Sequence, residues 1–354
     1  MKTNKLLTGA LAMILPATLC LSGCSFGIFN TFNYTYENAD KYTAGDREID
    51  DKITSINIDY ISGDVKVKGS DTDTVSVKEK SNKSLDEDHK VHTWVDGGTL
   101  YVRYCVSTKS ISFNGIEKDL EITIPEAQEL DDFIIDVSSG DMNLSGITSD
   151  KINTHASSGD IVLDCSASVI DIKSSSGDVN LNQTGNSDTV NVKVSSGDIV
   201  LNHDGDSNSM KVNSSSGKTD IHQAGTVGTA DFHSSSGGVK AEMGTVNSLT
   251  INVSSGELYL SADDVKDLNT KASSGHTNIA LNEAPKTSKL DCSSGGIEVR
   301  IPEDSDISVH VDISSGDFNS DIPFTKDGKD YINGNGTAQM NVHCSSGDVS
   351  FYKK

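Results

Sequence analysis

Apolar and polar residues alternate with a period of two in short stretches that recur along most of the chain. The ten residues KVSSGDIVLN, which begin at Lys193, are one example, and DVSSGDMNLS, KSSSGDVNLN and NVSSGELYLS are others. Period-two alternation predicts β-strands with one buried face. Because the alternation shifts phase at the Ser-Ser-Gly core, each stretch predicts a strand, a corner and a second strand.

The glycine of this motif recurs at nearly constant intervals. From position 140 to position 316 it returns every 18 to 21 residues, and further copies have their glycines at 63 and 347. Such a period is typical of solenoids, in which each repeat buries its apolar face only against its neighbours. The sequence predicts an all-β fold, a parallel β-solenoid with about 19–20 residues per coil. The usual chirality of parallel connections favours a right-handed coil.

The corner has a characteristic composition. Glycine adopts the positive φ of a sharp bend at little cost, and a serine precedes it in every copy. We expect this serine to point inward, where only a small side chain fits, and its hydroxyl to bond to backbone groups of the bend. The expected corner residues are Ser139 and Gly140, Ser158 and Gly159, Ser176 and Gly177, Ser196 and Gly197, Ser216 and Gly217, Ser236 and Gly237, and Ser255 and Gly256.

An aspartate follows the glycine in many copies. Stacked coils would place Asp141, Asp160, Asp178 and Asp198 in a column about 5 Å apart, where neighbouring carboxylates repel one another. Full exposure, hydrogen bonds from turn N–H groups, or bound Ca²⁺ would each relieve the repulsion. A turn-capping role is the simpler interpretation and a calcium site is the alternative; no other cofactor is expected.

The N-terminus resembles the export signal of a bacterial lipoprotein. Two lysines precede a mainly apolar stretch over 6–21, and Leu21-Ser22-Gly23-Cys24 resembles a lipobox. We therefore expect residues 1–23 to be a signal peptide and Cys24 to carry lipid. A lipidated cysteine would hold an extracytoplasmic protein on a bacterial membrane.

The net charge narrows the choice of partners. The chain carries −23, and loss of the two signal lysines would leave −25. This balance argues against nucleic acid as a partner, since binding to phosphates needs a basic face. It is compatible with cationic ligands.

The four remaining cysteines show no spacing typical of a zinc site. They are Cys105, Cys165, Cys292 and Cys344. Cys292 and Cys344 both lie three residues before a motif glycine, with Ile313 at the equivalent position of the copy between them. These two thiols should therefore lie two coils apart, roughly 9–10 Å by the strand spacing, which is too far for a disulfide. We interpret them as small buried hydrophobic residues.

The rest of the chain divides around the repeats. Residues 24–50 are rich in aromatic side chains and form either a membrane-proximal linker or a first strand. Residues 51–125 contain one early copy and a hairpin expected at Asp96-Gly97-Gly98, which together predict an N-terminal β cap. Residues 126–354 are the solenoid. Its inserted loop at 321–339, rich in Gly, Asn and Asp, is either a tolerated surface loop or a binding loop.

Several of these stretches together resemble a known family. They are the SSGD repeats, VKVKGSDTDTVSVK, LEITIPEA and the ending GTAQMNVHCSSGDVSFYKK. Over residues 50–354 the chain resembles the bacterial putative-adhesin family, a cell-envelope domain of unknown function. The resemblance implies a β-solenoid at the envelope, and some relatives are tied to envelope stress caused by antimicrobial peptides. The family supplies no catalytic residues to transfer.

We expect a non-catalytic, lipid-anchored module at the cell envelope, an adhesin-like binding or structural protein. Its partners would be an envelope glycan, a protein or a cationic peptide. One alternative is an envelope-stress sensor that binds cationic peptides. Another is a glycan lyase or hydrolase on a β-helix, but such enzymes place basic and acidic residues beside long loops, and this chain has three arginines and tight turns. No Walker, Rossmann or HExxH pattern occurs.

Overall fold

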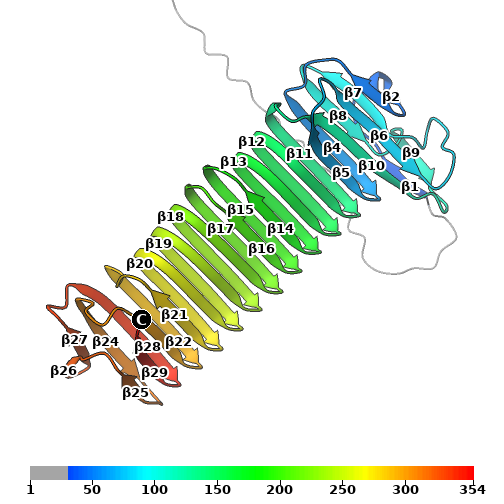
Figure 1. Cartoon of the computed structure of the whole chain (residues 1–354). Coiled ribbons are helices and arrows are strands. Elements are labelled where there is room, and N and C mark those ends of the chain that lie inside the picture. The colour runs from blue at the N-terminus through cyan, green and yellow to red at the C-terminus, as the bar shows by residue number, and fades with distance from the viewer. Residues whose placement is uncertain (1–30) are drawn as a thin grey trace, which may run out of the picture.

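The computed structural model describes residues 31–354 and shows a long stack of parallel β-coils (Figure 1). Within these residues nearly every element is a strand, apart from one 3₁₀ turn, η1 (Ala39–Lys41). The chain is therefore a β-solenoid, as the repeat predicts. The expected signal peptide (1–23) and Cys24 lie outside the described residues.

Each coil has two faces joined by two corners. Several strands are long enough to run through the second corner, where the pairing of β12 with β13 shifts register between Leu144 and Ile147. The strands of the repeat region are β11 (Glu129–Ser139), β12 (Met142–Ser158), β13 (Ile161–Ser176), β14 (Val179–Gln183), β15 (Ser187–Ser196), β16 (Ile199–His203), β17 (Ser207–Ser216), β18 (Thr219–Ser236), β19 (Val239–Ser255), β20 (Leu258–Ser274), β21 (Thr277–Leu281), β22 (Thr287–Ser294), β23 (Ile297–Ile301), β24 (Ile307–Ile313), β25 (Phe318–Ser320), β28 (Ala338–Ser346) and β29 (Val349–Lys353).

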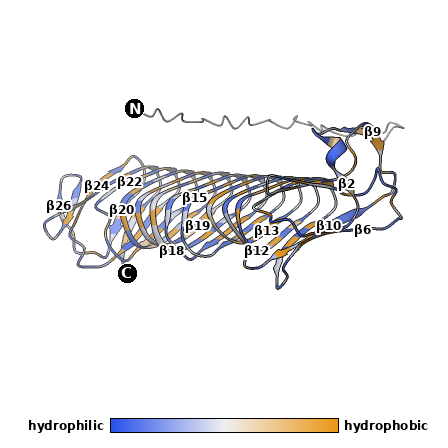
Figure 2. Cartoon of the chain, turned by 90° about the horizontal axis from the view of Figure 1, so that it is seen from above, coloured by the Kyte–Doolittle hydropathy of each residue, from blue (hydrophilic) through white to orange (hydrophobic). Residues whose placement is uncertain are grey.

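Neighbouring coils pair in register, with one motif directly over the next. Val192 of β15 pairs with Ile172 on one side and with Val212 on the other. All three side chains are almost completely buried, and burial of an aliphatic side chain of this size contributes about 1.5–3 kcal/mol. Figure 2 shows the resulting alternation of apolar and polar positions along the coils. The core is one continuous column that no single coil could form.

The N-terminal residues supply one coil and a cap over it. Strands β4 and β5 pair in parallel with β11 and β12, so the early motif copy is the first coil. Strands β7 and β8 form the expected hairpin through Gly97 and Gly98, both with positive φ. The strands of this region are β1 (Thr31–Tyr34), β2 (Thr43–Ala44), β3 (Arg47–Ile49), β4 (Ser55–Ser62), β5 (Val65–Ser70), β6 (Val75–Ser81), β7 (His92–Asp96), β8 (Thr99–Arg103), β9 (Thr108–Ser112) and β10 (Lys118–Pro125).

The aromatic residues near the start of the described chain pack against this cap. Phe32 stacks on Phe113 with ring centroids 5.6 Å apart, and Tyr42 lies between Tyr36 and Trp94. Strand β1 pairs with β9. From residue 31 onward, the segment is therefore part of the folded cap.

At the C-terminal end, the order of coils in space differs from their order in the chain. Strands β28 and β29 pair with β22 and β23 on one side and with β24 and β25 on the other. The last coil of the chain thus lies between the two coils that precede it. The expectation that Ile313 separates Cys292 from Cys344 is wrong, because these cysteines are direct partners on adjacent strands. The insertion at 321–339 gives the chain the length to return and pair with β22 and β23.

The insertion at 321–339 forms a cap. Strands β26 (Thr325–Asp327) and β27 (Asp330–Asn333) make an antiparallel hairpin, and β27 also pairs with β24. Phe318 and Tyr331 pack with ring centroids 4.0 Å apart, and Phe324 and Phe351 complete the aromatic cluster. The outermost coil is covered in this way, which protects the end of the sheet from edge pairing.

Candidate functional site

The corner glycines meet two requirements at once. Gly197 has a φ of 138°, and every corner glycine from Gly63 to Gly347 has a positive φ. A Cβ at Gly197 would also collide with the carbonyl oxygen of Gly177 in the preceding coil. The glycines therefore form a column in which each backbone closely approaches the next.

The corner serines lie on the outside, contrary to the expected inward position. Ser139, Ser158, Ser196 and their equivalents are all exposed. Their carbonyl groups take part in the ladder, since the Ser196 carbonyl oxygen accepts from the Gly177 N–H at 3.0 Å. The alternation of inward and outward side chains breaks over the two residues before the glycine, so the serine next to the glycine faces solvent.

The small inward residue of the bend stands three positions before the glycine. The Ser234 hydroxyl donates to the Gly237 carbonyl oxygen at 3.0 Å, and the Cys344 thiol to the Gly347 carbonyl oxygen at 3.3 Å. Both side chains are buried. This column performs the role expected of the serine next to the glycine.

The aspartates after the glycines form a hydrogen-bonded ladder. The Asp160 N–H donates to the Asp141 carboxylate at 2.9 Å, and the Asp198 N–H donates to the Asp178 carboxylate at 2.7 Å. A hydrogen bond to a charged acceptor contributes about 1.5–3 kcal/mol. Repulsion between neighbouring carboxylates about 5 Å apart is roughly 0.8 kcal/mol in bulk water and about 3 kcal/mol at the effective dielectric of a protein surface. The hydrogen bonds therefore offset the repulsion, and each carboxylate caps the corner of a neighbouring coil.

The calcium alternative for Asp141, Asp160, Asp178 and Asp198 lacks a suitable cage. Over residues 31–354, no group of three or more His, Cys, Asp or Glu side chains is arranged to hold a metal ion. Each of these carboxylates instead has a backbone N–H of the following coil as its partner.

A second ladder runs along the opposite corner, and the sequence analysis missed it. The Asp206 N–H donates to the Asn186 amide oxygen at 2.9 Å, and the Thr226 N–H donates to the Asp206 carboxylate at 2.7 Å. The signal was present as Asn and Asp residues spaced by 20 in the turns Gly-Asn-Ser-Asp and Gly-Asp-Ser-Asn. Both corners thus use the same capping chemistry.

Three outward histidines that share one column each pair with an aspartate. The pairs are His155–Asp136 at 3.0 Å, His233–Asp231 at 2.7 Å and His343–Asp312 at 3.4 Å. The hydrogen bond that the His155 ring makes to the Asp136 carboxylate raises the pKa of His155. Since the pairs lie on different coils, each is a separate surface contact.

The N-terminal cap contains a buried ion pair that the sequence analysis also missed. The Lys118 ammonium lies 2.7 Å from Glu79, donates to the carbonyl oxygens of His89 and Tyr104, and sits 4.1 Å from the Tyr104 ring centroid. Burial lowers the pKa of Lys118 and raises that of Glu79, and the ion pair opposes both shifts. A signal existed, because Lys118 shares the inward parity of Leu120 in KDLEITIP. Lys118 thus links Glu79 to the aromatic ring of Tyr104 inside the cap.

The three arginines all have structural contacts. Arg47 donates to Thr93 and Arg103 to the Asn57 carbonyl oxygen, while Arg300 pairs with Glu298. The glycan lyase alternative needs basic and acidic side chains converging beside a loop. Arg47 and Arg103 lie in the N-terminal cap and Arg300 lies in β23, so the three arginines do not converge on one site.

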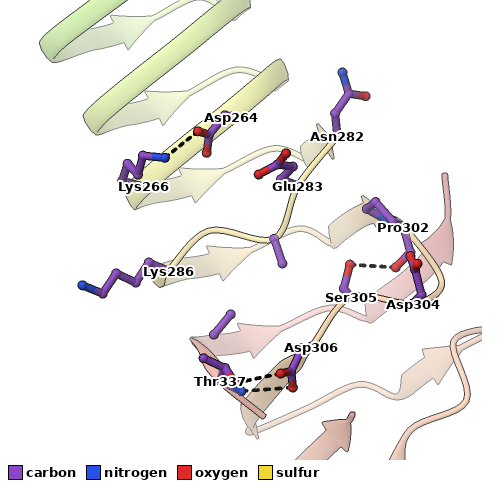
Figure 3. A pocket seen from close by; sticks show the side chains of 12 residues that line it. Asp264, Lys266, Asn282, Glu283, Lys286, Pro302, Asp304, Ser305, Asp306 and Thr337 are labelled. Carbon is purple, nitrogen blue, oxygen red and sulfur yellow. Dashed lines mark hydrogen bonds and ion pairs between the residues drawn. The ribbon is translucent and has the colours of Figure 1, made fainter. Parts of the chain in front are cut away.

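One groove lies near the C-terminal end and has a volume of about 530 Å³ (Figure 3). Loops between strands replace the regular wall here. Asp264 binds Lys266 at 2.7 Å, and Asp306 accepts from the Thr337 hydroxyl at 2.7 Å. These two pairs are bound within the groove, and Glu283, Lys286 and Asp304 also line it.

A family model described as Toastrack DUF4097 matches residues 53–186 and again residues 184–351. The chain belongs to this family. Strands β13 and β14 pair with β15 and β16 across the junction of the two matches. The two Toastrack segments therefore form one uninterrupted stack.

Several solved structures are similar to this Toastrack chain, and no curated protein matches it. A putative adhesin from Parabacteroides distasonis ATCC 8503 is 14% identical, covering 89% of this chain and 97% of that one, with a TM-score of 0.41. A putative adhesin from Parabacteroides merdae ATCC 43184 is 13% identical (89% and 96%; TM-score 0.36). A putative lipid binding protein from Parabacteroides distasonis ATCC 8503 is 15% identical (88% and 97%; TM-score 0.32).

Among residues 31–354 of the Toastrack chain, no helix has the length and apolar character needed to cross a bilayer.

Proposed function

We propose that this Toastrack chain is a non-catalytic module of the bacterial cell envelope, anchored by lipid at Cys24, that works as a binding or structural rod. The observation that carries the proposal is the lipobox-like Leu21–Cys24 a few residues before β1 of a solenoid. The anchor would tether the chain at its N-terminal cap.

The architecture suits such a role. Stacked coils repeat the same surface position at intervals of about 4.8 Å along the stack. Repeated positions allow several weak contacts to act together, which raises the overall affinity. The net charge of −23 keeps such a rod dispersed in solution.

Substitution of the proposed lipid-bearing cysteine tests the anchor. We expect Cys24→Ala to move the protein from the membrane fraction of cells to the soluble or secreted fraction, because the acyl chains supply the attachment. Cell fractionation with metabolic fatty-acid labelling measures this, and Cys20→Ala is the matched control. Unchanged membrane retention of the Cys24→Ala protein would refute the anchor.

A second candidate function is the capture of cationic peptides. The exposed carboxylates of Asp141, Asp160, Asp178 and Asp198 favour it, because they lie side by side on successive coils.

Salt dependence tests peptide capture. We expect an amphipathic cationic peptide to bind at about 20 mM salt and to weaken steeply by about 150 mM, as screening shortens the reach of exposed charges. The paired variant Asp160→Asn with Asp178→Asn keeps the capping acceptors and removes two charges, so titration calorimetry should show weaker binding. Affinity that is insensitive to both changes counts against capture by this column.

A further inference from the structure

One outward face of the rod carries a cluster of basic and amide side chains near its middle. We call it the basic patch, and it is formed by Lys173, Lys193, Lys211, Asn213 and His233. These residues belong to strands β13, β15, β17 and β18, and the four strands lie side by side (Figure 1). Lys173 is the register partner of Lys193, Lys193 of Asn213, and Asn213 of His233. One unbroken row of four therefore crosses these coils, with Lys211 in the adjacent row.

The patch differs in charge from the rest of the molecule. The patch contains three lysines, and two aspartates, Asp171 and Asp231, lie beside it. The whole chain, in contrast, has a net charge of −23. Lys173 is bound to Asp171 at 2.7 Å, and Lys211 lies 3.9 Å from Asp231. Two of its lysines are thus partly neutralised.

Lys193 is the exception. Within the part of the chain that the structure describes, no carboxylate lies within 4.0 Å of its ammonium group. Its side chain is exposed, and its register partner Lys173 carries the same charge. An anion at this point would offset the repulsion between two like charges one strand spacing apart.

The surface around Lys193 is hollowed and rich in hydrogen-bonding groups. A depression of about 510 Å³ is lined by Asn191, Lys193, Lys211, Asn213, Ser214, Ser215, His233 and Ser235. The side chain of Ser214 is buried. Ser215 and Ser235 are exposed. The large hydrophobic side chains exposed by residues 31–354, which are Ile134, Val200 and Tyr259, lie elsewhere.

This combination indicates the chemistry of a ligand. A lysine recognises a carboxylate, and amides with hydroxyls recognise sugar hydroxyl groups. A long polyanion such as nucleic acid would be repelled by the acidic body. We propose that the basic patch binds an acidic glycan, an oligosaccharide with uronic-acid carboxylates. Lys193 and Lys211 would contact a carboxylate, and Asn213, Ser215 and Ser235 would contact ring hydroxyls. The inference deepens the envelope function proposed above and rests on it.

Binding of a defined uronate tests the site. We expect the full chain in detergent to bind tetragalacturonate at low salt, and the double variant Lys193→Gln, Lys211→Gln to bind it at least about tenfold more weakly, because charge-assisted hydrogen bonds are lost. Lys271→Gln is the matched control, since Lys271 is exposed on the same face in β20, outside the depression. Its affinity should be unchanged.

Other outcomes overturn the inference. Absence of tetragalacturonate binding to the unmodified chain refutes the site, and so does equal weakening by Lys271→Gln. Equally strong binding of inorganic phosphate shows an unspecific anion site and also refutes the glycan. Because Cys24-dependent membrane retention is measured separately, a retained protein that binds no uronate overturns only this site.

Discussion

Glycine at a coil corner combines a backbone conformation with a packing requirement. A residue other than glycine held at such a φ would cost about 1–3 kcal/mol in conformational energy. The backbone of the preceding coil lies where a side chain would begin, so there is no room for a Cβ. The two requirements explain why glycine stands at this position in every motif copy.

Substitution of a central corner glycine tests this explanation. We expect Gly197→Ala to lower the free energy of unfolding by about 2 kcal/mol or more, because the conformational cost of φ 138° is joined by a collision with Gly177. Urea unfolding followed by circular dichroism measures the change. Ser196→Ala is the control and should stay within about 0.5 kcal/mol, since Ser196 is exposed. Equal stability of the two variants would contradict the account.

A partly buried carboxyl in the first coil makes stability depend on pH. Burial raises the pKa of Asp59 to about 6, with Asp136 adding to the shift and Arg103 opposing it. A raised pKa means that the folded chain holds the proton more tightly than the unfolded chain. The contribution of this group therefore falls as the pH rises from about 4 to about 6, with each tenfold change in proton affinity worth about 1.4 kcal/mol.

The variant Asp59→Asn isolates this contribution. We expect it to gain stability relative to the unmodified chain above pH 6 and to lose that advantage below pH 4, where the aspartate is protonated in both states. Melting temperatures measured from pH 4 to pH 8 give the comparison. A difference that does not change with pH would show that this carboxyl is not responsible.

At the scale of strands and corners, the sequence predicted much of the architecture. Alternation located the paired strands of each coil, and the glycine period located the corners. The serine beside the glycine was misplaced because alternation was extended through the bend, where the backbone is no longer a regular strand. Ser196 is exposed for this reason, while the inward position is that of Val194.

The candidate sites were predictable to different degrees. The aspartate column followed from stacking, because Asp141 to Asp198 occupy one position of the repeat. The Lys118–Glu79 pair was missed, since a lysine at an inward position was not considered. The basic patch depends on register between coils, which brings Lys193 beside Asn213 and Lys211 beside Asp231. The position of a residue in the repeat does not by itself show which of these side chains are bound to one another.

At the scale of the whole molecule, the chain forms one continuous stack in which the last coil of the chain lies one position before the end of the stack. The sequence could not predict this order, because the copies that end at Gly316 and Gly347 carry the same motif and either could pair with β22. In the structure Gly347 packs on Gly295, and Gly316 on Gly347. The hairpin β26–β27 can then cover the outer coil.

Cysteine cross-linking tests this stack most directly, in a chain whose Cys292 and Cys344 are replaced by serine. Asp291 and His343 are register partners, and Asp312 is the next partner along. We predict that Asp291→Cys with His343→Cys forms a disulfide on mild oxidation, because adjacent strands are about 4.8 Å apart. The pair Asp291→Cys with Asp312→Cys should not form a disulfide, because β28 lies between the strands that carry these two residues. Cross-linking of the second pair without the first would contradict the account.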